Sequence, residues 1–145
     1  MTERHANWSR PPAPRAGHFA LALTACAVFA VYGSLVPLDY TPQDWNSAVE
    51  RFRRISWLEL GVVHRADWVA NILLFVPLGF LGLAVSEVDR RFGPRTVVVM
   101  GATLVVWSAL SLAIEFTQLW FPPRTVSLND LIAETIGALV GMLGW

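Results

Sequence analysis

Residues 114–130 read Ile-Glu-Phe-Thr-Gln-Leu-Trp-Phe-Pro-Pro-Arg-Thr-Val-Ser-Leu-Asn-Asp, and they join one long apolar run to the next. Glu115 is the only charged residue between Arg95 and Arg124. At the centre of a membrane helix an acid costs roughly 2.5–3.5 kcal/mol on insertion scales, and less near a helix end. A carboxylate in such a place usually has a partner and a function, and Arg124 or Asp130 can supply the partner.

The composition of the whole chain is that of a membrane protein. Of 145 residues, 54% are hydrophobic and only 15% are charged, which is too apolar for an ordinary soluble domain. The formal net charge is zero, so the sequence indicates no nucleic-acid partner. The single cysteine, Cys26, fits neither a disulfide within the chain nor a metal-thiolate site. We therefore expect an integral membrane protein, and no cofactor or metal is indicated.

Four apolar runs predict four transmembrane helices, at residues 18–36, 67–85, 96–121 and 128–145. The first run spans about 28 Å as a helix, close to the thickness of the hydrocarbon core. Its basic leader also fits a signal peptide, although the length favours a retained helix. The fold we expect is all-α, a bundle of four transmembrane helices in two helical hairpins over residues 18–145. A disordered, proline-rich basic tail at residues 1–17 precedes it.

The longest polar connection, residues 38–66, contains a further helical pattern. Apolar residues recur at helical spacing from Trp45 to Leu58, with Glu50 and several arginines between them. This pattern predicts a short amphipathic helix in the membrane interface. A helix that caps the end of the bundle fits the same pattern equally well.

The arginines predict the orientation, because loops on the cytoplasmic side carry an excess of basic residues. The side of the N-terminal tail carries Arg4, Arg10, Arg15, Arg90, Arg91 and Arg95, and the opposite side carries Arg51, Arg53, Arg54, Arg65 and Arg124. The first set lies closer to the helix ends. We therefore expect both termini in the cytoplasm.

An up-and-down topology of four helices brings scattered polar residues to one end of the bundle. Asp67 and Asn71 lie at the start of the second expected helix, and Asp130 and Glu134 lie at the start of the fourth. Glu115 and Gln118 lie near the end of the third. Each pair has the i, i+3 or i, i+4 spacing of one helix face, so we expect one polar layer opposite the termini. Asp67 and Asp130 also fit plain helix caps, and Asn71 and Gln118 fit simple ties between helices. Glu115 is the hardest of these residues to explain by structure alone.

Several motifs carry a family resemblance. They are Asp67-Trp-Val-Ala-Asn71-Ile-Leu-Leu-Phe75-Val-Pro77-Leu-Gly79, Glu115-Phe-Thr-Gln118, Pro123-Arg124-x-x-Ser127-x-x-Asp130, and Gly137 with Gly141. Through them the chain resembles the VanZ-like membrane protein family over roughly residues 30–145. The resemblance implies a small multi-helix protein of the bacterial inner membrane, in a family whose founding member is associated with low-level teicoplanin resistance. Gly137 and Gly141 also have the small-xxx-small spacing that favours tight helix packing.

The candidate ligand-binding residues combine the polar layer with the family motifs. They are Asp67, Asn71, Glu115, Gln118, Arg124, Ser127, Asp130 and Glu134. Glu134 stands where the family usually has asparagine. It is therefore protonated, or paired with Arg124 or another cation, or it marks a site for a different ligand.

Three functions compete on this evidence. The first is a cell-envelope or resistance factor in contact with membrane lipids, which binds a polar headgroup, a lipid-linked wall precursor or a glycopeptide. The second is a membrane enzyme acting on a lipid-linked substrate, with Glu115 as general base and Asp130 as a further catalytic candidate. The third is a transporter. We favour the first function, because the sequence contains no nucleophile motif and no phosphate-binding loop. The sequence does not define the oligomeric state.

Overall fold

The structure is a computed structural model that describes residues 16–57, 62–88, 91–122 and 124–145. Five helices follow one another in this part of the chain: α1 (Ala16–Leu35), α2 (Trp45–Arg53), α3 (Val62–Glu87), α4 (Pro94–Gln118) and α5 (Leu128–Leu143). The described residues contain no strand, so the all-α fold class is confirmed. Of the basic tail expected at residues 1–17, residues 1–15 lie outside the description, and Ala16 and Gly17 already belong to α1.

Several helix starts follow from local chemistry. The Asp44 carboxylate caps α2 by accepting a hydrogen bond from the Ser47 backbone N–H at 3.1 Å. Pro94 stands at the first position of α4, where the missing N–H costs nothing. Ser127 caps α5, because its hydroxyl accepts a hydrogen bond from the Asp130 backbone N–H. Short polar side chains therefore mark where α2 and α5 begin.

The start of α3 differs from our expectation. The helix begins at Val62, so Asp67 lies in its second turn and is not the helix cap. The apolar run indicates where a helix becomes compatible with a bilayer, but the backbone can be helical through the polar residues that precede it. Asp130 is not a cap either, since Ser127 occupies that position in α5.

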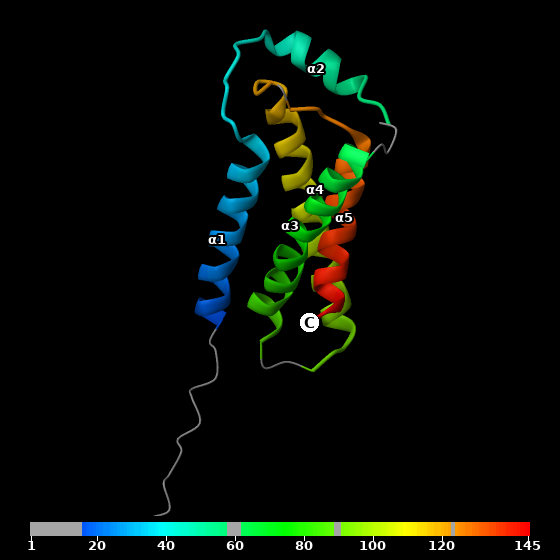
Figure 1. Cartoon of the computed structure of the whole chain (residues 1–145). Coiled ribbons are helices and arrows are strands. Elements are labelled where there is room, and N and C mark those ends of the chain that lie inside the picture. Colours follow the sequence, from blue (N-terminus) through cyan, green and yellow to red (C-terminus); the bar gives the residue numbers. More distant parts are fainter. Residues whose placement is uncertain (1–15, 58–61, 89–90, 123) are drawn as a thin grey trace, which may run out of the picture.

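The long helices lie side by side, and α3 and α5 form the centre of the bundle (Figure 1). They run in the same direction, with α1 packed on α3 and α4 packed on α5. Three glycines allow α3 and α5 to approach closely, because a Cβ at Gly79, Gly137 or Gly141 would overlap a main-chain carbonyl of the facing helix. The tight packing expected from the small-xxx-small pattern is therefore confirmed.

Three helices are long and apolar enough to cross a membrane: α1, the Arg65–Glu87 part of α3, and α4. Their outer faces expose large apolar side chains, such as Leu21 and Val98 at 73% and 72% relative exposure. Helix α5 has only 16 residues and is not one of these three candidate spans. The structure thus confirms a bundle with three candidate spans, and it does not establish α5 as a fourth.

Helix α2 lies across the end of the bundle, over the end of α4 (Figure 1). Ala48 is fully buried, and the rings of Trp45 and Phe52 contact Phe116 of α4 at centroid distances of 5.1 and 5.3 Å. These contacts favour the interpretation of α2 as a cap on the bundle. Trp45 nevertheless remains 63% exposed, so α2 also presents an aromatic side chain to its surroundings.

Candidate functional site

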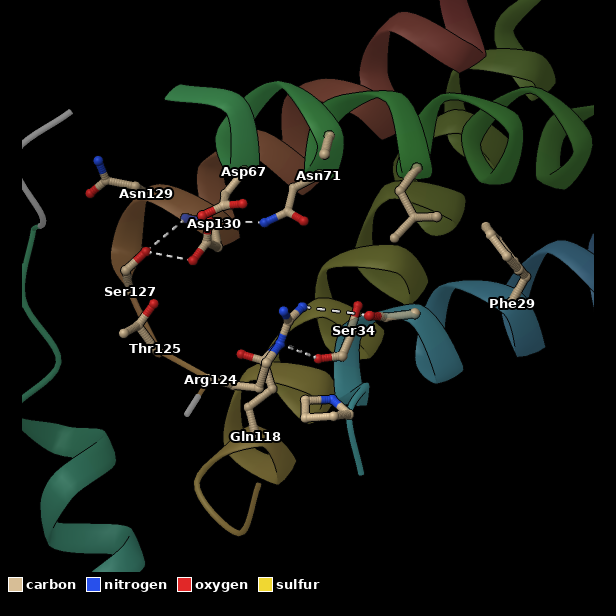
Figure 2. A pocket seen from close by; sticks show the side chains of 14 residues that line it. Phe29, Ser34, Asp67, Asn71, Gln118, Arg124, Thr125, Ser127, Asn129 and Asp130 are labelled. Atoms are coloured by element: carbon tan, nitrogen blue, oxygen red, sulfur yellow. Dashed lines mark hydrogen bonds between the residues drawn. The ribbon is translucent and has the colours of Figure 1, made fainter. Parts of the chain in front are cut away.

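A cavity of about 410 Å³ opens at the α2 end of the bundle, among α1, α3, the end of α4 and the start of α5 (Figure 2). Its lining residues are Phe29, Gly33, Ser34, Pro37, Asp67, Ala70, Asn71, Leu74, Gln118, Arg124, Thr125, Ser127, Asn129 and Asp130. The set contains most of the predicted ligand-binding residues. The topology therefore does bring these distant polar side chains together at one end.

Asp130 is held at the junction between the two central helices. Its Oδ1 accepts a hydrogen bond from Asn71 Nδ2 of α3 at 2.9 Å, and its Oδ2 accepts one from the Ser127 hydroxyl at 2.7 Å (Figure 2). The Asp130 backbone N–H donates to the Ser127 hydroxyl in turn, at 3.2 Å. Both carboxylate oxygens are therefore fixed in direction, and the carboxylate faces the cavity.

Asp67 lies one helical turn before Asn71 and lines the same cavity. Its side chain is exposed, which places it at the open edge. Figure 2 shows Asp67 and Asn71 projecting from α3 toward the cavity. The i, i+4 spacing seen in the sequence therefore corresponds to two polar groups on one wall.

Arg124 binds the end of α1. Its Nε donates a hydrogen bond to the main-chain oxygen of Ser34 at 2.9 Å, and Gln118 Nε2 donates to the same oxygen at 3.0 Å. A second contact joins Arg124 Nη2 to the Gly33 carbonyl oxygen at 3.5 Å. Because these carbonyls end a helix, they need partners from outside it. Arg124 and Gln118 thus close the bundle and line the cavity at once.

Glu115 and Glu134 are not among the residues that line the cavity. Each is only 1% exposed. Glu115 Oε2 accepts a hydrogen bond from the Ser127 backbone N–H at 3.1 Å, so it holds the start of α5. Glu134 Oε2 accepts a hydrogen bond from the Ser111 hydroxyl, which joins α5 to α4.

Neither buried glutamate has the arginine partner that we considered. Arg124 donates its hydrogen bonds to the main-chain oxygens of Ser34 and Gly33. The structure instead gives Glu115 a main-chain N–H and Glu134 a serine hydroxyl. Both glutamates therefore hold helix α5 in place next to α4 in this structure, whereas their role in ligand binding stays a prediction.

Several residues of the site were not predicted from the sequence. Ser111 carried a usable signal, because a polar residue one turn before Glu115 in an apolar helix shares its face. Thr125 and Asn129 flank Ser127 and line the cavity, and their place in a polar turn gave no reason to single them out. The carbonyl oxygen of Ser34 carries no sequence signal, because every residue has one.

The cavity combines opposite charges with an apolar wall. Asp67 and Asp130 can accept hydrogen bonds from ammonium or hydroxyl groups, and Arg124 can bind a phosphate or carboxylate. Phe29 and Leu74 add apolar surface. Among the described residues, no group of three or more His, Cys, Asp or Glu side chains is arranged to hold a metal ion. The arrangement suits an amphiphilic molecule with a charged head.

Comparison with known protein families matches the chain to a family model. The family model described as VanZ/LLP1 matches residues 17–145, which includes every residue that lines the cavity. No curated protein and no solved structure matches the chain.

Proposed function

Because the chain belongs to the VanZ/LLP1 family, we propose that it is an integral membrane protein whose cavity binds the polar head of a cell-envelope ligand. Helices α1, α3 and α4 cross the bacterial inner membrane, and α5 completes the bundle as a fourth spanning helix along α3. Both termini lie in the cytoplasm. The cavity then opens on the outer side, where wall precursors and glycopeptides are met.

The observation that carries the proposal is the pairing of charge and apolar surface in one cavity of about 410 Å³. Asp67 and Asp130 offer acceptors for ammonium and hydroxyl groups, and Arg124 offers a planar donor for an anionic group. A lipid-linked wall precursor or a teicoplanin-type glycopeptide combines polar groups of these kinds with an apolar chain, which suits the apolar wall formed by Phe29 and Leu74. By binding such a ligand in this cavity, the protein reduces the effect of a teicoplanin-type antibiotic.

The position of Glu115 favours binding over catalysis. A general base must come within hydrogen-bond reach of the proton that it removes. Glu115 does not line the cavity, and one of its carboxylate oxygens already accepts a hydrogen bond from Ser127. Asp130 does line the cavity, and the hydrogen bonds from Asn71 and Ser127 fix it as an acceptor for a bound ligand.

The test is teicoplanin susceptibility in a sensitive bacterial host. We expect the wild-type protein to raise the inhibitory concentration, and Arg124→Ala and Asp130→Asn to abolish most of the increase. Arg91→Ala is the matched control, because Arg91 is exposed and lies in the connection between α3 and α4, away from the cavity lining. Protein levels in the membrane fraction are compared by immunoblot.

Two results would contradict the proposal. If the wild-type protein leaves susceptibility unchanged, the resistance role is wrong. If Arg124→Ala and Asp130→Asn protect as well as the wild type at equal expression, the cavity is not the binding site.

A further inference from the structure

A second cavity, of about 380 Å³, lies between α2 and the turn that follows α4. Its lining residues are Thr41, Gln43, Arg51, Arg54, Ile55, Ser56, Gln118, Leu119, Pro122, Arg124, Thr125 and Val126. Among these residues the charged ones are all arginines. The first cavity, in contrast, has carboxylates in its wall.

The three arginines supply this second cavity with charged hydrogen-bond donors. Arg51 Nη1 donates to Gln43 Oε1 at 2.8 Å. Because a guanidinium group can only donate, this bond fixes the Gln43 amide with its oxygen toward Arg51. The amide nitrogen, Gln43 Nε2, is buried and has no hydrogen-bond partner among the described residues. A buried donor of this kind normally has an acceptor, and Gln43 lines the second cavity.

We propose that this second cavity binds a phosphate group, held by Arg51, Arg54 and Arg124, with Gln43 Nε2 as a further donor. Guanidinium groups bind phosphate oxygens through paired, charge-assisted hydrogen bonds. Arg54 also contacts Glu50 at 3.2 Å, but both side chains are largely exposed. An exposed pair of this kind contributes little stability, so it does not prevent Arg54 from binding a stronger anion.

The surroundings of the cavity match the depth of lipid headgroups. Trp45 and Trp57 flank the same segment, and each is 63% exposed. Tryptophan is enriched where a membrane protein meets the headgroup layer. The phosphate source that this placement favours is therefore a lipid or a lipid-linked molecule.

The two cavities adjoin each other, because Arg124, Gln118 and Thr125 line both. One ligand can therefore place a phosphate against α2 and a second polar group against Asp130. This inference rests on the proposed function for the place of the ligand in the envelope. It adds that the ligand carries a phosphate.

Phosphate binding can be measured on the purified full-length protein, apart from any antibiotic. In detergent solution, titration calorimetry would use dihexanoyl phosphatidic acid in one arm and inorganic phosphate in the other. We expect Arg51→Gln and, separately, Arg54→Gln to weaken binding about tenfold or more, since each removes charge-assisted hydrogen bonds. Arg53→Gln is the matched control, because Arg53 is an exposed arginine of α2 outside the cavity lining, and it should bind within about twofold of wild type.

The arms also identify the source of the phosphate. Binding of phosphatidic acid alone supports a lipid-borne phosphate, and binding of both probes, or of inorganic phosphate alone, supports a site for the phosphate group itself. If neither probe binds, or if Arg51→Gln and Arg54→Gln both bind as Arg53→Gln does, the inference is overturned. Loss of teicoplanin resistance on Arg124→Ala with no phosphate binding in wild type would overturn this inference and leave the proposed function standing.

Discussion

Gly141→Ala should separate the two central helices. A Cβ at Gly141 would overlap the Val76 carbonyl oxygen and crowd the Phe80 backbone nitrogen of α3. Both obstacles are main-chain atoms, so no change of side-chain rotamer can relieve them. Gly101→Ala is the matched control, because Gly101 is an exposed glycine inside α4 with open space where the Cβ would stand.

The magnitude follows from the difference between the two variants. Replacing glycine by alanine inside a helix favours the helix by about 1 kcal/mol at either site. Overpacking a close contact costs about 1–3 kcal/mol. The gain in helix propensity is the same in both variants and cancels when they are compared. We therefore expect the free energy of unfolding of Gly141→Ala to be about 1–3 kcal/mol lower than that of Gly101→Ala.

Unfolding in mixed detergent micelles, followed by circular dichroism during a titration with sodium dodecyl sulfate, measures this difference. Gly101→Ala should be as stable as wild type or more so. If Gly141→Ala is as stable as Gly101→Ala, then α3 and α5 do not meet as closely as the structure has them. A ligand-binding defect should accompany the loss of stability, because Asn71 of α3 and Asp130 of α5 are joined across the interface of the same two helices.

Three further variants test the polar layer with the same unfolding measurement. Asn71→Leu removes the donor to Asp130 and should cost about 1 kcal/mol, and an unchanged stability would mean that this bond is not made. Ser127→Ala removes the cap of α5 and should also cost about 1 kcal/mol, whereas Ser127→Thr should retain most of the stability; equal losses in both would argue against capping. Ser111→Ala should cost about 1–3 kcal/mol, because it leaves the buried Glu134 oxygen without its donor. Glu134→Gln keeps an acceptor for Ser111 and should cost less, so a larger loss than in Ser111→Ala would contradict this assignment.

Much of the fold could be predicted, because apolar length and helical spacing are properties of the local sequence. The runs that begin at residues 18, 96 and 128 correspond closely to α1, α4 and α5. The amphipathic pattern after Trp45 corresponds to α2. The start of α3 at Val62 was missed, because hydrophobicity reports where a helix suits a bilayer and does not report where the helical backbone begins.

The depth of each site residue could not be predicted in the same way. Topology alone placed the polar residues at one end of the bundle. Whether a side chain lines the cavity or lies beneath it depends on the rotation of its helix, and α4 is apolar on nearly every face, so its sequence does not define that rotation. Glu115 and Glu134 were therefore grouped with Asp130, although the structure buries both side chains and neither lines the cavity.

The shared carbonyl oxygen of Ser34 has a consequence for the order in which the chain assembles. It accepts hydrogen bonds from Gln118 and Arg124, which follow it by 84 and 90 positions in the sequence. During synthesis, these two donors are made long after α1. Until then, water or lipid headgroups must donate the hydrogen bonds to the Ser34 carbonyl oxygen. The carbonyl at the end of α1 thus obtains these partners only after α4 and the turn that follows it have been made.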